Sequence, residues 1–384
     1  MISKNYISAV ATVVGTVIGA GVFALPILVN LSGVVPFVFF LVFLGAIQYL
    51  YLKMYASVVL ATKTEHRVPG YVEAYGGKRY KKLVSFICLL GGYGGLLAYV
   101  ILGGLYAHEL LSPIFGGSAV AYSIGLFAVQ AVIVLFGLKA ISRAELALSI
   151  ILVLVAGLIS WKGLSNFNAD NFKLSDLSDW RFSLMLYGPV FFSLGGDAAV
   201  PEVCRLLVKE KHKIKNALLW GTVISAAITG LFVLAAVWAV GDLSTPDTLV
   251  GLNRVLDGGI IYLALIFGVI NIATSFLVSL QALREIYWWD FKMNETLSWF
   301  LAAAVPLGLF LLGVKNVTSV VSLTGAITGG ILCVIMIRLS QAAARRPQRK
   351  SPFKVELGAW PAAILTVIFL AGFAYEILSV FKII

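Results

Sequence analysis

Long apolar runs separated by short polar stretches follow one another along the whole chain. A membrane-spanning helix needs about 20 predominantly apolar residues, and the chain contains many runs of that length or longer. They predict an all-α integral membrane protein with eleven transmembrane helices. The expected helices cover residues 6–31, 34–61, 83–112, 119–137, 144–161, 181–205, 216–240, 259–286, 294–313, 316–337 and 360–380.

The first of these runs carries glycines and a proline where a plain lipid-facing helix needs none. It reads Gly15-Thr-Val-Ile-Gly-Ala-Gly-Val-Phe-Ala-Leu-Pro26. Glycine weakens a helix and proline lacks the amide hydrogen, so this stretch predicts a break inside the membrane. Backbone groups freed by such a break must be satisfied by protein, water or a ligand. A helix-packing face built on Gly15 and Gly19 is the alternative.

The sixth run repeats this pattern at a matching position in the second half of the chain. Gly21-Val-Phe-Ala-Leu-Pro26 and Gly196-Asp-Ala-Ala-Val-Pro201 share the spacing G-x-x-A-x-P. Two interrupted helices in corresponding positions indicate an inverted-repeat transporter with substrate bound between the breaks. We therefore expect a first five-helix repeat over residues 6–162, an inverted second repeat over 181–338, and an additional helix 11 over 360–380.

Composition and charge agree with a membrane protein. Hydrophobic residues make up 60% of the chain and charged residues only 12%, which is far from a soluble domain. The net charge of +11 comes from Lys and Arg residues that gather in the loops on one side. By the positive-inside rule, we expect a protein of the cell (inner) membrane with a cytoplasmic N-terminus and an external C-terminus, and we expect no nucleic-acid partner.

The residue pattern also argues against an enzyme. The cysteines and histidines show no metal-ligand spacing, and no nucleophile–base pair or phosphate loop is present. We expect no cofactor beyond a coupling ion, and no obligatory protein partner is evident. The expected partners are a small-molecule substrate and the lipid bilayer.

Three polar features mark candidate chemistry within the spans. Asp197 lies near the middle of the sixth run, where an acid is a functional candidate by default, as a partner for a substrate ammonium or as a proton carrier; a structural hydrogen bond is its alternative. Asn271, Thr274, Ser275 and Ser279 share one face of the eighth run and could ligate a cation or bond their own helix. Tyr99, at mid-depth in the third run, is a candidate for a cavity wall.

The first-run motif Gly15-Thr-Val-Ile-Gly-Ala-Gly-Val-Phe-Ala-Leu-Pro26 resembles the first-helix signature of the amino acid–polyamine–organocation superfamily. Within it, the chain is most similar to the amino acid/auxin permease group and its bacterial hydroxy and aromatic amino acid permeases. The broken sixth run and Ala273-Thr-Ser-Phe-Leu277 agree with this. The resemblance implies the fold of the bacterial leucine transporter, a five-plus-five inverted repeat.

The resemblance also implies where substrate and ion would bind. The backbone amides of Gly19, Ala20 and Gly21 would take the substrate carboxylate, and the carbonyls of Thr16, Val17, Ser193 and Leu194 would take its amine. A sodium ion would lie between the carbonyls of Gly15, Ile18 and Asn271 and the hydroxyls of Thr274 and Ser275. Bacterial relatives are generally driven by protons, which leaves proton and sodium coupling both open.

The chain departs from the aromatic permeases in the sixth run. Where they carry an F-G-F-H-like sequence, this chain has Ser193-Leu-Gly-Gly-Asp197, and Asp197 fits an additional amine or cation partner better than aromatic stacking. The predicted function is a cation-coupled amino acid symporter working by alternating access. An amino acid exchanger and an amino-acid-sensing receptor on the same fold are the alternatives.

Overall fold

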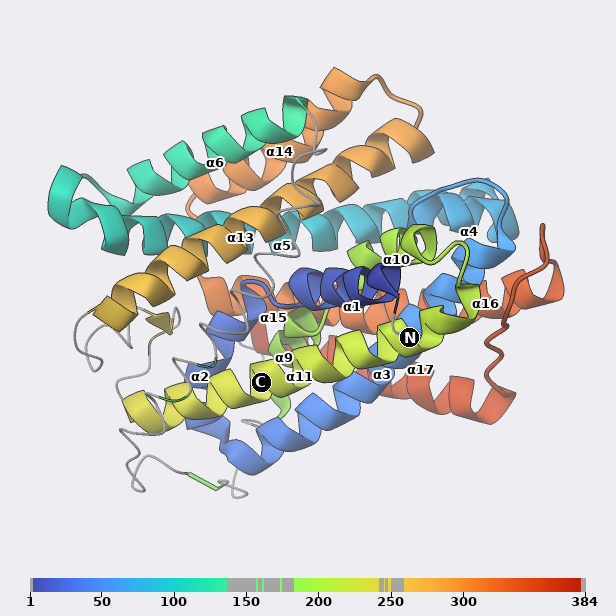
Figure 1. Ribbon diagram of the computed structural model, residues 1–384, viewed down its shortest axis with the longest axis horizontal. Helices are drawn as coiled ribbons and strands as arrows, with labels where there is room; N and C mark the ends of the chain where they lie inside the picture. Colours follow the sequence, from blue (N-terminus) through green and yellow to red (C-terminus); the bar gives the residue numbers. More distant parts are fainter. Residues whose placement is uncertain are drawn as a thin grey trace.

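The computed structural model describes residues 3–136, 183–241 and 259–380, together with residues 157, 161, 173–174, 245 and 248–249. The elements of this described part are helices that run largely along one common direction (Figure 1). Seven of them are long and apolar enough to cross a membrane, or eight when one bent pair is counted as a span. The expected all-helical membrane architecture is therefore confirmed.

The first run is broken, and the structure places the break on three residues. Helix α1 (Lys4–Val17) ends where α2 (Gly21–Ser32) is about to begin, and the two are bent by 56°. Residues 18–20 lie between them. Pro26 lies inside α2, so the proline does not make the break; the glycines on either side of Ala20 do.

The sixth run is broken as well. Helix α9 (Tyr187–Ser193) is followed by a short turn, the single-turn helix η2 (Asp197–Ala199) and α10 (Val200–Leu206). The G-x-x-A-x-P motif thus begins, in both runs, where the second half-helix starts: Gly21 opens α2, and Gly196 precedes η2 and α10. The similarity between the two sequences has a structural counterpart.

The half-helices pair with each other across the two breaks. Helix α1 packs against α10, and α2 packs against α9, while α11 (Ile214–Val240) contacts both α1 and α2. The two breaks meet at Gly21, because a Cβ atom added there would lie 2.6 Å from the Cα of Ser193. No side chain fits between them.

The other predicted spans surround this centre. They are α3 (Val34–Ala61), α5 (Lys78–Phe115), α6 (Ala119–Phe136), α13 (Gly259–Glu285), α14 (Glu295–Leu311) and α17 (Ala359–Val380). Helix α17 lies at the edge of the bundle (Figure 1). The fifth expected helix, over 144–161, falls outside the described residues except for residues 157 and 161.

The tenth run is longer and less regular than the sequence predicts. Helix α15 (Val317–Ala326) passes through the π-helical turn η6 (Ile327–Ile331) into α16 (Leu332–Arg345). A second π-helical turn, η5 (Ile286–Asp290), follows α13. The expected end at residue 337 was wrong because α16 becomes amphipathic there and continues on polar residues that apolar scanning does not count.

Two features of the expected loops are also structured. The stretch between α3 and α5 contains the helix α4 (Val68–Gly76), with Pro69 in its first turn, packed against α5 and α16. The chain after α16 caps α3: the backbone amides of Gln348 and Arg349 both donate to the carbonyl of Ala61. The Arg349 side chain donates to the carbonyls of Leu60 and Val59.

Candidate functional site

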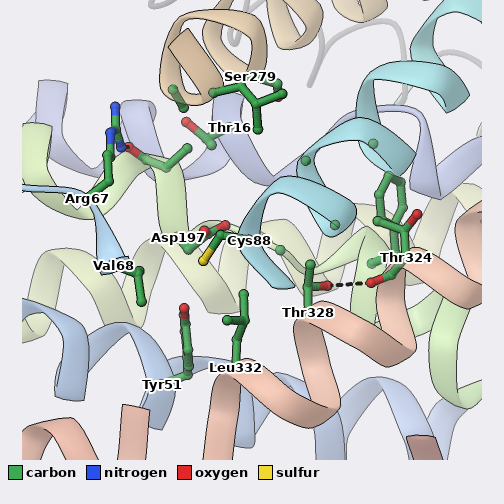
Figure 2. A pocket seen from close by; sticks show the side chains of 18 of the residues that line it. Thr16, Tyr51, Arg67, Val68, Cys88, Asp197, Ser279, Thr324, Thr328 and Leu332 are labelled. Atoms are coloured by element: carbon green, nitrogen blue, oxygen red, sulfur yellow. Dashed lines mark hydrogen bonds between the residues drawn. The ribbon is translucent and has the colours of Figure 1, made fainter. Parts of the chain in front are cut away.

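A cavity of about 180 Å³ lies where the two breaks meet. Its wall combines residues of both breaks with α3, α5, α13, α15 and α16, and Figure 2 shows side chains from these elements pointing into one space. Of the residues expected from the sequence, six line it: Thr16, Val17, Gly19, Gly21, Tyr99 and Asp197. We call this space the central cavity.

Three expected substrate residues lie beside the central cavity and do not line it. Ala20 and Leu194 are fully buried, and Ser193 is nearly so. The Ser193 hydroxyl donates to the carbonyl of Val190 within its own helix. Leu194 points toward α3, where its Cδ1 atom lies near Gly45. These residues belong to the breaks themselves, so their backbone and not their side chains would meet a ligand.

Asp197 opens into the central cavity. It begins η2 directly after the break and is solvent-accessible, although the surrounding helices enclose this part of the chain. Figure 2 shows its carboxylate beside Cys88 and facing the space between Tyr51 and Thr328. An acid at this position can accept a proton or pair with a cationic group in the cavity.

Arg67, which the sequence suggested only as a topology signal, is part of the site. Its guanidinium contacts Oε2 of Glu285 at 2.7 and 2.8 Å, and both side chains are at least 84% buried. Gln281 donates to the other oxygen of Glu285 over 3.0 Å. Glu285 pairs with Arg67, so among these three ionisable groups Asp197 is the one without an ion-pair partner in the described part of the chain.

A second cavity of about 340 Å³ lies beyond Arg67, on the side of α1 and α10. We call it the vestibule. Thr16, Arg67 and Ala198 line both spaces, and Arg67 also donates to the carbonyl of Ala198 over 3.5 Å. The Arg67–Glu285 ion pair therefore stands at the boundary between the central cavity and the vestibule.

The other end of the site, on the α2 side, is closed by aromatic rings. Phe23 packs edge-on against Tyr106 and Phe232, with ring centroids 5.4 and 5.5 Å apart. The hydroxyl of Thr248 donates to the carbonyl of Phe23. Aromatic rings thus pack together on the α2 side, and an ion pair stands on the α1 side, where the central cavity adjoins the vestibule.

The wall formed by α5 is made of glycines because neighbouring side chains occupy their space. A Cβ atom at Gly91 would lie 2.5 Å from Thr328, and one at Gly92 would lie 2.2 Å from Leu283. Gly95 differs, since a Cβ there would meet only Phe192 at 3.7 Å. Gly95 and the ring of Phe192 thus form an apolar part of the wall with room beside it.

The polar face of α13 lies against the first break. A Cβ atom at Gly19 would be 3.2 Å from both the Ser275 hydroxyl and the Tyr99 hydroxyl. Asn271 and Ser275 are buried, and the Thr274 hydroxyl donates to the carbonyl of Asn271 within its own helix. Ser279 lines the central cavity. The structure therefore places this face beside the Gly15–Gly19 segment, with Thr274 already engaged.

Sequence reasoning missed several residues of the site. Arg67 and Glu285 sit at helix ends, where charges are ordinary, and only the fold shows that they meet. Gln48 on α3 also lines the central cavity, and a lone amide within an apolar run could have identified it. Tyr51, Phe191, Phe192 and Cys333 also line the cavity, but they cannot be told apart from packing residues by sequence.

Comparison with known proteins gives one family and two structural likenesses. The tryptophan/tyrosine permease family matches residues 2–378. The fold is similar to the crystal structure of MhsT in complex with L-phenylalanine, with a TM-score of 0.68, 15% identity and coverage of 98% of both chains. Mhp1, a nucleobase-cation-symport-1 family transporter in a closed conformation with bromovinylhydantoin bound, has a TM-score of 0.67 and 15% identity, over 98% of this chain and 91% of Mhp1. No curated protein sequence matches the chain.

Proposed function

Because this chain belongs to the tryptophan/tyrosine permease family, a family of membrane transporters and not of enzymes, we propose that it is a cation-coupled symporter of an aromatic amino acid. The observation that carries the proposal is the central cavity between two broken helices, which is lined by one acid, Asp197, and by several aromatic rings. The backbone of the breaks would bind the charged amino and carboxylate groups of such a substrate, and the aromatic wall would contact its ring.

The architecture behind this function is two inverted five-helix repeats, over 6–162 and 181–338, followed by helix 11 over 360–380. The break in each repeat and the shared G-x-x-A-x-P motif support the division. Likeness to MhsT and Mhp1 supports the same fold. Eleven spans would put the two termini on opposite sides of the inner membrane, and the loop charges favour a cytoplasmic N-terminus and an external C-terminus.

The substrate would lie with its charged end at the breaks. The amides of Gly19, Ala20 and Gly21 open α2 and would bind the carboxylate, as helix starts do. The carbonyls of Thr16, Val17, Ser193 and Leu194 and the carboxylate of Asp197 would take the ammonium. The ring of the substrate would extend toward Gly95, Phe192 and Tyr99, where the wall leaves room.

Proton coupling through Asp197 accounts for the charges of the site better than sodium coupling does. Asp197 is accessible and can take up and release a proton in the central cavity. The hydroxyl of Thr274, one ligand of the expected sodium site, donates to the carbonyl of Asn271 and keeps its oxygen lone pairs for a cation. The other ligands of that site would be Gly15, Ile18, Asn271 and Ser275. A sodium ion there remains the alternative coupling ion.

Uptake of labelled amino acids into proteoliposomes tests the proposal. We expect tryptophan or tyrosine to accumulate under an inward proton gradient and not under a sodium gradient alone. The Asp197→Asn variant should lose this accumulation but keep exchange of labelled for unlabelled substrate. Exchange persists because a transporter with a neutral side chain at position 197 can still change conformation with substrate bound, without carrying a proton. Binding without accumulation or exchange would favour a receptor, and exchange without accumulation by the wild type would favour an exchanger.

A further inference from the structure

A second intramembrane acid, far from the ion pair, contacts the substrate site from behind. Glu376 is the only Asp, Glu, Lys, Arg or His residue in α17, a predominantly apolar helix. Only 11% of the most apolar stretch of α17 is buried inside the protein, whereas Glu376 is almost completely buried, with 2% of its surface exposed. A helix that mostly faces lipid thus directs one carboxyl group toward the protein interior. A buried acid there is energetically unfavourable unless it is hydrogen-bonded.

The partner of Glu376 is the backbone of the sixth run. The amide N–H of Gly188 donates to Oε1 of Glu376 over 2.9 Å. Gly188 is in the first turn of α9, where amides have no partner within the helix. The carboxylate thus satisfies a backbone donor that would otherwise be buried without a partner, which is unfavourable.

The fit around this hydrogen bond is close. A Cβ atom at Gly188 would lie 2.7 Å from Oε1 of Glu376 and 2.4 Å from the carbonyl oxygen of Ser322 on α15. A Cβ at Gly325 would lie 1.8 Å from the carbonyl oxygen of Gly188. Helix α9 is therefore held between α15 and α17 by backbone contacts that admit no added methyl group.

The same helix carries part of the cavity wall. Phe191 lines the central cavity and packs edge-on against Phe369 of α17, with ring centroids 6.2 Å apart. A Cβ atom at Gly372 of α17 would lie 2.5 Å from the ring of Tyr187, which begins α9. Helix α17 thus contacts α9 through one hydrogen bond and two aromatic rings, and one of these rings reaches the cavity.

We propose that Glu376 is a positioning residue for transport: its carboxylate fixes α9 against α15, and so sets where Phe191 stands in the substrate site. A helix at the lipid boundary then helps to determine which side chain the cavity accepts. This inference rests on the proposed function, because it assumes that the central cavity binds the substrate.

Substrate kinetics of variants at both ends of the hydrogen bond test the inference. Glu376→Leu should raise the KM for tryptophan about tenfold and raise that for a small amino acid less, while kcat per folded transporter changes less than twofold. Glu376→Gln should stay within about threefold of the wild type, because its amide oxygen can accept the same bond. Gly188→Ala should raise the KM for tryptophan at least as much as Glu376→Leu, since the added methyl group would meet both Oε1 of Glu376 and the backbone carbonyl of Ser322.

The matched control is Thr366→Val on the same helix, which removes a hydroxyl that bonds only the carbonyl of Ala362 in its own helix. We expect wild-type kinetics for it. If Glu376→Leu does not fold, Glu376→Asp replaces it, with an intermediate KM expected from the shorter side chain. Unchanged KM and selectivity in the folded variants overturn the inference, whereas a wild type that neither binds nor transports any amino acid overturns the proposed function instead.

Discussion

At the scale of single residues, the site depends on a position where no side chain fits. Gly21 opens α2 directly opposite Ser193, and a Cβ atom there would lie 2.6 Å from a backbone carbon and 2.9 Å from the Phe192 ring. Backbone cannot rotate away as a flexible side chain can. The contact therefore fixes the distance between the two breaks.

We expect Gly21→Ala to lower the rate of uptake at least about tenfold, since overpacking of about 1–3 kcal/mol would separate the breaks. The control is Gly125→Ala on α6, where an added Cβ meets nothing within 4 Å. Initial uptake rates, normalised to the amount of transporter in the vesicles, make the comparison. Equal rates for the two variants would contradict the close contact at Gly21.

Arg67 and Glu285 provide a second test at this scale, through a double-mutant cycle. Each single change, Arg67→Gln or Glu285→Gln, leaves the partner charge buried and should lower uptake more than about tenfold. The double variant removes both charges and should recover part of the loss, with a coupling of about 0.5–3 kcal/mol. Additive losses in the three variants would show that the two groups act independently.

At the scale of elements, most helices could be predicted because their apolar runs have the length of a membrane span. The sequence did not predict the remaining elements, for reasons that differ from one element to the next. Helix α4 is nine residues long and lies between charged residues, and α16 continues past the membrane on an amphipathic pattern. Propensity and hydropathy cannot show that Arg349 returns to cap α3, because that contact joins residues almost 290 positions apart.

The cap itself can be tested. The side chain of Arg349 donates to the carbonyls of Leu60 and Val59 in the last turn of α3, where carbonyls lack the usual helical partner. The Val59 carbonyl also accepts from the amide of Thr62. Since Arg349 is partly solvated, we expect Arg349→Ala to cost about 1 kcal/mol and to lower the Tm by about 2 °C. Arg346→Ala, in an exposed neighbour, should leave the Tm unchanged. A thermal-shift measurement on purified protein separates the two.

The candidate site was predicted in part, for a comparable reason. Glycine-broken runs reveal where a helix cannot continue, so Gly19, Gly21 and Asp197 could be identified in advance. The side chains that complete the cavity come from α3, α5, α13 and α15, and their faces are set by packing between helices. Gly91 and Thr328 illustrate this. Neither residue stands out in the sequence, and only the structure shows that the Thr328 side chain fills the space a Cβ atom of Gly91 would occupy.

At the scale of the whole molecule, the native cysteines report on orientation. Cys88 and Cys333 line the central cavity, and Cys204 lines the vestibule. With Cys88 and Cys333 replaced by serine, a membrane-impermeant thiol reagent should inhibit uptake from the cytoplasmic side only. Cys204→Ser in that background should remove the inhibition. Modification of Cys204 from outside would reverse the proposed topology.

The pairing of half-helices has a consequence for the energy balance of the cell. Helix α1 packs with α10 and α2 packs with α9, so each end of the pathway has its own pair. Opening one end does not require the other pair to separate. A continuous aqueous path would need both pairs to part at once, and ions passing through such a path would discharge the membrane potential. For the symporter proposed above, the arrangement would therefore protect the gradient that drives uptake.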